Sequence, residues 1–103
     1  MKVKQSYTAK LLVNKKPVEL NPFVEEYLAR ISVGIVTSLK GIDYIRSIKI
    51  HHEHDDVTIA VNGEEVSLTP FPVQIIANTL HGLVSTLKGI DAIKSLHITV
   101  EAQ

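Results

Sequence analysis

Several stretches of the chain alternate between hydrophobic and polar residues, and two longer stretches follow a helical period. Residues 57–61 alternate as a β-strand with one buried face does. Asn62-Gly63 follows them and is typical of a two-residue hairpin turn, because both residues tolerate the positive φ that this turn requires. The turn predicts a hairpin with Ile59 opposite Val66, both facing the core.

The first half of the chain repeats this pattern with a weaker turn signal. A hairpin around Lys15-Lys16-Pro17 would place Leu11 opposite Val18 and Ala9 opposite Leu20. Each hairpin therefore consists of a long strand followed by a short one. A further alternating strand is predicted in each half, with these apolar positions: Ile48 and Ile50, then Leu96, Ile98 and Val100.

A helix follows each hairpin and has clear start and stop signals. Asn21-Pro22 and Thr69-Pro70 are typical helix starts, because Asn and Thr cap the first turn and proline loses nothing at the first helical position. The segments 40–42 and 88–90 both read Lys-Gly-Ile, which predicts a helix end with glycine in the left-handed conformation.

The apolar residues of the first helix predict a broad side that faces the core. Gly34 and Gly82 occupy equivalent places in the two helices, where glycine lowers helix stability by about 1 kcal/mol relative to alanine. We therefore expect a close backbone approach at these glycines. The residues of the predicted apolar side are Phe23, Val24, Tyr27, Leu28, Ile31, Ile35 and Leu39.

The second helix lacks charge from Thr69 through Leu87, although a solvated helix face usually carries Lys and Glu. Two interpretations remain open at this point, namely packing between the two helices and an intermolecular helix face. The second interpretation predicts an interaction face with these outward residues: Gln74, Asn78, His81 and Ser85.

The two halves of the chain also match each other directly. Residues 13–53 align without a gap with residues 61–101, and 18 of the 41 pairs are identical, where chance would give about two or three. Two copies are too few for a solenoid, so the match predicts an internal duplication that folds as one pseudo-two-fold domain. Repeat one spans about 5–53 and repeat two about 54–103, within a single domain of residues 1–103.

The order of elements predicts an α+β two-layer sandwich built from two ββαβ repeats, with two helices on one face of a mainly antiparallel sheet. The strand order stays open between two arrangements. A ferredoxin-like order fits the βαββαβ skeleton, whereas the Asn-Gly hairpin favours a six-stranded sheet with the short strands at its edges.

Composition narrows the class of protein without naming a function. The chain has 103 residues, no cysteine and no tryptophan, which excludes a disulfide scaffold and cysteine-ligated metal. No apolar run approaches the roughly 20 residues of a membrane span, and residues 1–4 do not begin a signal peptide, so we expect a cytoplasmic protein.

Charge is segregated between the halves although the net charge is zero. Residues 1–50 contain nine basic and four acidic residues, and residues 51–103 contain two basic and seven acidic residues. This distribution is compatible with attraction between the halves, with head-to-tail contacts between molecules, or with drift of solvated charges.

Candidate chemistry is concentrated at the turn that joins the repeats, His51-His52-Glu53-His54-Asp55-Asp56. His52 and His54 would project to one side of a strand, and a two-residue turn would place Asp55 opposite His52. These three residues are the candidate metal ligands, for Zn²⁺ or Ni²⁺. His51 and Glu53 would project to the other side, as His97 does. A polar turn without a metal role is the simpler interpretation, and we expect no cofactor.

Enzymatic motifs are missing from the sequence, because it contains neither a nucleophile elbow, nor His-Glu-x-x-His, nor a phosphate-binding glycine loop. The leading prediction is a small non-enzymatic protein–protein interaction or assembly module that forms a homo-oligomer or binds a protein partner. A metal-binding protein is the first alternative. The second is a weak single-stranded nucleic-acid binder using Lys4, Lys10 and Lys49, although the outward strand positions carry no aromatic residue for base stacking.

Overall fold

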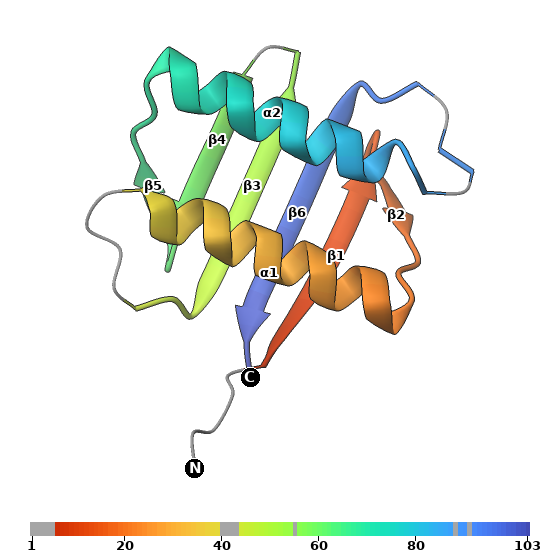
Figure 1. Ribbon diagram of the computed structural model, residues 1–103, viewed down its shortest axis with the longest axis horizontal. Coiled ribbons are helices and arrows are strands. Elements are labelled where there is room, and N and C mark those ends of the chain that lie inside the picture. Colours follow the sequence, from red (N-terminus) through yellow and green to blue (C-terminus); the bar gives the residue numbers. More distant parts are fainter. Residues whose placement is uncertain (1–5, 40–43, 55, 88, 91) are drawn as a thin grey trace.

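The computed structural model describes residues 6–39, 44–54, 56–87, 89–90 and 92–103. Two layers are formed, a sheet and a pair of helices that both lie on one face of it and run antiparallel to each other (Figure 1). This confirms the predicted α+β two-layer architecture. The elements are β1 (Tyr7–Val13), β2 (Lys16–Val18), α1 (Pro22–Ser38), β3 (Ser47–Glu53), β4 (Asp56–Val61), β5 (Glu64–Val66), α2 (Pro70–Val84) and β6 (Ser95–Ala102).

The sheet has six strands in the order β2-β1-β6-β3-β4-β5, and all five neighbouring pairs are antiparallel. The short strands β2 and β5 lie at the two edges, as the hairpin signals predicted. The long strands β6 and β3 lie at the centre, and each repeat contributes one of them.

The ferredoxin-like order is not confirmed. That order would place β1 and β4 between other long strands, and a strand has only two edges at which to pair. Here β1 uses one edge to pair with β2, and β4 uses one edge to pair with β5. The two hairpins therefore require β1 and β4 to lie next to the outside of the sheet.

The predicted hairpin registers are confirmed near the turns and are wrong farther from them. Leu11 lies opposite Val18, and Ile59 lies opposite Val66. Strand β2 ends at Val18, however, so Ala9 does not pair with Leu20. Instead the backbone N–H of Ala9 donates to a carboxylate oxygen of Glu25 on α1 at 3.1 Å, which satisfies a donor at the sheet edge.

Both helices begin at the predicted prolines, but side-chain capping is confirmed only for Asn21, because the Thr69 side chain makes no capping hydrogen bond. One helix end also differs from the prediction. The Asn21 side chain accepts a hydrogen bond from the backbone N–H of Val24 at 2.8 Å, as expected of an N-cap. Helix α2 ends at Val84, several residues before the predicted stop, because the chain then tightens into hydrogen bonds that span three residues. Gly89 does adopt a positive φ of 80°, whereas residues 40–43 and 88 lie outside the described part of the chain.

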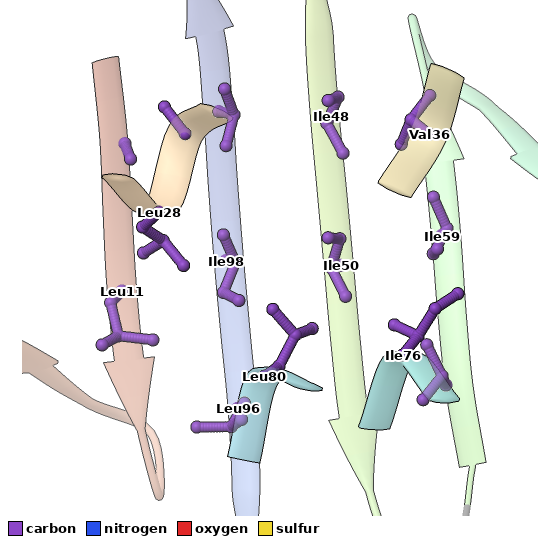
Figure 2. Close-up of a cluster of buried hydrophobic side chains, with 14 of the residues drawn as sticks. Leu11, Leu28, Val36, Ile48, Ile50, Ile59, Ile76, Leu80, Leu96 and Ile98 are labelled. Carbon is purple, nitrogen blue, oxygen red and sulfur yellow. The ribbon is translucent and has the colours of Figure 1, made fainter. Parts of the chain in front are cut away.

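The core lies between the sheet and the two helices. One row of buried side chains crosses the four long strands, and Figure 2 shows how Leu28 and Val36 of α1 and Ile76 and Leu80 of α2 cover this region. The row is symmetric about its centre, where Ile50 of β3 lies opposite Ile98 of β6. From one edge of the sheet to the other, its members are Val18, Leu11, Ile98, Ile50, Ile59 and Val66.

Adding 48 to the numbers of Val18, Leu11 and Ile50 gives Val66, Ile59 and Ile98, so the strand pairing of the first half recurs in the second on the other side of the Ile50–Ile98 pair. The central β3–β6 pair joins one repeat to the other along seven residue pairs. Because all of these pairs cross between repeats, the two repeats share a single core.

Two asparagines, one in each repeat, form equivalent side-chain hydrogen bonds to the backbone of the other repeat. The side-chain oxygen of Asn62 accepts hydrogen bonds from the backbone N–H groups of Arg46 at 2.6 Å and Ser47 at 3.1 Å, and its amide donates to the Tyr44 carbonyl at 2.8 Å. Asn62 belongs to repeat two, whereas its three partners belong to repeat one.

Asn14 makes the equivalent three bonds from repeat one to repeat two. It accepts from the N–H groups of Lys94 at 2.7 Å and Ser95 at 3.1 Å and donates to the Ala92 carbonyl at 2.8 Å. Asn14 and Asn62 both have a φ of 53°, a left-handed conformation that asparagine tolerates better than most residues. The identity of these two residues between the repeats therefore has a structural cause.

Candidate interaction surface

Large hydrophobic side chains are exposed at equivalent positions of the two helices. Phe23 and Tyr27 of α1 are 73% and 47% exposed, and Phe71 and Ile75 of α2 are 72% and 49% exposed. The prediction that Phe23 and Tyr27 face the core is therefore wrong. A sheet covers only one side of a helix, whereas the apolar arc of this sequence is wider than the side that the sheet can cover.

The exposed residues lie opposite the buried side of their helix. At 100° per residue, Phe23, Tyr27 and Gly34 fall on the side away from Leu28 and Ser32, which are buried. The rings of Phe23 and Tyr27 stack with their centroids 5.7 Å apart. We call these positions on both helices the outer helix face; it comprises Phe23, Tyr27 and Gly34 on α1, and Phe71, Ile75 and Gly82 on α2.

The glycines of this face do not permit a close approach within the chain. Gly34 and Gly82 are exposed, and a Cβ added at either position would meet no atom of the described residues within 4 Å apart from its chain neighbours and the nearby backbone of its own helix. The expected contact with the other helix or the sheet is therefore wrong. Each glycine destabilises its helix without a packing reason inside the described part of the molecule.

Replacing Gly34 or Gly82 by alanine is expected to raise the free energy of unfolding by about 1 kcal/mol each, because alanine favours the helix and has room for its methyl group. Urea denaturation of each variant at low protein concentration measures this gain. Gly63, with a φ of 87°, is the matched control, because alanine at that position should destabilise the protein. A loss of stability in the Gly34 and Gly82 variants would contradict the open surroundings of these two positions.

The residues predicted as an interaction face on α2 are all exposed and border the outer helix face. Gln74, Asn78, His81 and Ser85 present amide, imidazole and hydroxyl groups to the solvent. On α1, Arg30 and Glu26 neutralise each other through an ion pair with an N–O distance of 2.8 Å. The outer helix face is therefore bordered by neutral polar groups on α2 and by a mutually neutralised ion pair on α1.

The histidine turn has a different register from the predicted one. Glu53 lies opposite Asp56, and His52 lies opposite Val57, so the expected pairing of His52 with Asp55 is wrong. The turn forms one position later, where His54 adopts a φ of 57°. This register also pairs Ile48 with Val61 and so brings Asn62 within reach of Ser47.

The candidate ligands have different surroundings. His52 faces the helix side of the sheet, where its Nδ1 atom is buried and has no hydrogen-bond partner among the described residues. The His54 side chain is 87% exposed in the turn. Asp55 lies outside the described residues, and within the described part of the chain no three His, Asp or Glu side chains are grouped as a metal site requires.

On the open face of the sheet, two histidines from different repeats stack on each other. The rings of His51 and His97 are nearly parallel with centroids 4.8 Å apart, and Nε2 of His51 lies 3.4 Å from a carboxylate oxygen of Glu53. The prediction that these three residues share a side of the sheet is confirmed. Their contacts join the central strands β3 and β6.

Replacing His52 by valine is expected to stabilise the protein by about 1 kcal/mol, because the substitution removes a buried nitrogen that lacks a partner. The equivalent position of repeat two is Val100, which is fully buried, so the site accepts this shape. Urea denaturation measures the change, and His54→Val, at an exposed turn position, is the control with little expected effect. A destabilised His52→Val variant would show that the imidazole makes a stabilising interaction.

Two of the three lysines considered for nucleic-acid binding lie on the described part of the open sheet face. Lys10 and Lys49 lie on either side of Thr99, whereas Lys4 lies outside the described residues. Glu101 lies opposite Thr8 and Ser47 in the next row of the same face. The outward strand positions that the structure describes carry no Phe or Tyr, so stacking of bases on such rings has no support there.

Part of the segregated charge lies at the two opposite edges of the sheet. Lys15 and Lys16 lie at the β1–β2 hairpin, and Glu64 and Glu65 lie on β5. Four strands separate these edges, so the two groups do not attract each other within one molecule at short range. Pro17 in β2 has no N–H to donate to an added strand, which disfavours edge-to-edge pairing between molecules.

An open groove of about 730 Å³ lies between the start of α1 and the segment after α2. Its lining is mostly apolar and includes one carboxylate, that of Glu19. A nucleophile paired with a base is therefore missing from the residues that line it. The lining residues are 18–22, Val24, Thr86 and Leu87.

Comparison with known proteins adds no relative. The chain matches no family model, and no curated protein or solved structure is significantly similar to it. Among the residues that the structure describes, no helix combines the length and the apolar character needed to cross a membrane.

Sequence reasoning missed two sets of residues that the structure brings forward. The first is the outer helix face, whose signal was the identity of Phe23 with Phe71 and of Gly34 with Gly82 in the two repeats. The second is the pair Asn14 and Asn62, whose side chains bond from one repeat to the other. These two residues are also identical in the alignment of the repeats. In both cases an identity between the repeats marked a role that hydrophobic periodicity could not reveal.

Proposed function

We propose that the protein is a small non-enzymatic assembly module that self-associates through the outer surface of its helix layer. The exposure of large hydrophobic side chains at equivalent positions of both helices carries this proposal, with Phe23 and Phe71 both more than 70% exposed. Large hydrophobic side chains exposed one helical turn apart, as Phe23 with Tyr27 and Phe71 with Ile75, are typical of a binding site.

The surroundings of these residues support the proposal. Helix α2 contains no Lys, Arg, Asp or Glu, and its outward amides can form hydrogen bonds across an interface without the desolvation penalty of a charge. Exposed apolar residues beside neutral polar groups have the composition expected of a protein–protein interface.

The proposal predicts that a charge placed on α2 weakens the association. Asn78→Lys and His81→Lys each add an ammonium group beside the apolar residues, and in an oligomer this group would have to be desolvated. We expect a dissociation constant at least about tenfold higher for each variant, which corresponds to about 1.4 kcal/mol. Sedimentation equilibrium over a range of concentrations measures it.

The matched control is Thr58→Lys, which adds the same charge at an exposed position of the open sheet face. Its dissociation constant should equal that of the unmodified chain. A protein that stays monomeric at every concentration, with the lysine variants behaving identically, would contradict self-association.

We also propose that the chain arose by duplication of a half-length unit that formed a homodimer. The three equivalent hydrogen bonds of Asn14 and Asn62 support this history, because each asparagine bonds to the other repeat as it would to a partner subunit. The position of Ile50 opposite Ile98 on the pseudo-two-fold axis supports it as well.

A further inference from the structure

We propose that the occupant of the outer helix face is a second copy of this chain, with Phe23 and Phe71 each placed over Gly34 or Gly82 of the other copy. This inference rests on the proposed self-association and adds the geometry of the contact. The partner is identified by its shape, as a helix layer that has the same exposed phenylalanine rings and the same glycine positions without a side chain.

The shape of each helix is complementary to itself. On α1, Phe23 and Gly34 are 11 residues apart, which is about three turns, or roughly 16 Å along one side of the helix. On α2, Phe71 and Gly82 have the same separation. When two such helices meet antiparallel, the phenylalanine of each reaches the glycine of the other, so both contacts form at once.

The monomer already has the symmetry that this arrangement needs. Its two helices run antiparallel and carry equivalent faces (Figure 1). A closed dimer requires the same patch on both subunits, related by a two-fold axis. A second copy meets this condition on both helices simultaneously, so a single dimer makes four phenylalanine–glycine contacts.

The glycines provide an independent observation in favour of this contact. Space is open around both positions, since a Cβ built there has no described atom within 4 Å apart from its chain neighbours and the nearby backbone of its own helix. Glycine at these exposed helical sites weakens the helix without serving the fold. The missing side chain leaves room for an aromatic ring from outside the molecule.

The available area and charge also fit a second copy. The exposed parts of Phe23, Tyr27, Phe71 and Ile75 amount to on the order of 500 Å², a large share of the roughly 800 Å² that each partner buries in a standard interface. The ion pair between Arg30 and Glu26 leaves the outer side of α1 neutral. Two copies can therefore approach without repulsion between like charges.

Placing larger side chains at the two glycine positions tests this geometry, because the expected effect on dimer affinity is opposite to the expected effect on monomer stability. The double variant Gly34→Leu/Gly82→Leu introduces a strong helix former at two open positions, so its melting temperature as a monomer should rise. The leucine side chains would occupy the space of the incoming rings. We expect the dimer dissociation constant to increase at least about tenfold by sedimentation velocity.

Two further variants complete the test. Thr58→Leu adds the same side chain to the open sheet face and should leave the dissociation constant unchanged. Phe23→Ala/Phe71→Ala removes the rings from exposed sites and should weaken the dimer as much as the leucine variant does. This second double variant decides the result if the leucine variant fails to fold.

The outcomes distinguish the two proposals. A dimer that persists with unchanged affinity in the leucine variant overturns the phenylalanine–glycine contact, and the broader assembly proposal stands if the Asn78→Lys variant still dissociates. An unmodified chain that remains monomeric overturns both. A more stable leucine variant that is monomeric where the unmodified chain is dimeric supports the inference.

Discussion

Replacing Ile98 by alanine is expected to lower the free energy of unfolding by about 4 kcal/mol. Ile98 is fully buried at the centre of the sheet, opposite Leu11 on one side and Ile50 on the other. The substitution leaves a cavity in the row of side chains that spans both repeats, and the surrounding strands cannot close it without breaking their register. A domain of this size has a total stability of about 5–15 kcal/mol, so the loss is a large fraction of it.

Urea denaturation monitored by circular dichroism measures this effect. Thr99→Ala, at the neighbouring position on the open face, is the control and should change stability by less than about 0.5 kcal/mol. Ile50→Ala should match Ile98→Ala, because the two isoleucines lie opposite each other and each has one further aliphatic neighbour across the sheet, Ile59 or Leu11. A loss below about 1 kcal/mol at either isoleucine would contradict the central position of this pair in the core.

Replacing Asn62 by alanine is expected to lower the free energy of unfolding by about 3 kcal/mol. The substitution removes three exposed hydrogen bonds between the repeats, each of which contributes about 0.7 kcal/mol. Alanine also adopts the left-handed conformation, here with a φ of 53°, less readily than asparagine does. Asn14→Ala should have a similar effect, because Asn14 makes the same three bonds in the opposite direction.

A glycine variant separates the two causes. Asn62→Gly keeps the positive φ without strain and removes only the side-chain bonds, so it should lose about 2 kcal/mol. Gln74→Ala, at an exposed helical position, is the control with little expected change. Equal stability of Asn62→Ala and the unmodified protein in urea denaturation would show that the three Asn62 hydrogen bonds do not stabilise the contact between the repeats.

The local structure was predictable because the signals for it are local. Asn62-Gly63 determines the register of Ile59 and Val66, and Asn21-Pro22 determines where α1 begins. These features depend on the backbone preferences of a few neighbouring residues. The two-layer arrangement follows from them, since strands with one apolar face need helices to cover that face.

The strand order was predictable in principle from the same hairpins. A strand that pairs with a short hairpin partner has one edge left, which excludes the ferredoxin-like order for β1 and β4. The register of the histidine turn was less accessible, because His52 and Asp55 occupy a run without a glycine or proline to define the turn. The turn position is determined by more distant contacts, such as the one between Asn62 and Ser47.

The candidate surface was only partly predictable. The uncharged outward stripe of α2 indicated Gln74 and Asn78, and the structure exposes both. Phe23 was assigned to the core because periodicity counts apolar residues without knowing how wide a side the sheet covers. Gly34 was assigned to an internal contact for the same reason, since the sequence contains no information on which side of the helix is already occupied.

The central claim is that the molecule self-associates through its helix layer, and chemical-shift changes on dilution test it most directly. Heteronuclear NMR spectra of the ¹⁵N-labelled chain, recorded over a hundredfold range of concentration, report on each backbone amide separately. Self-association through the helix layer predicts concentration-dependent amide shifts at Phe23, Gly34, Phe71 and Gly82, while the amide of the open-face residue Thr99 stays unchanged. Spectra that do not depend on concentration, or shifts confined to the open sheet face, would contradict it.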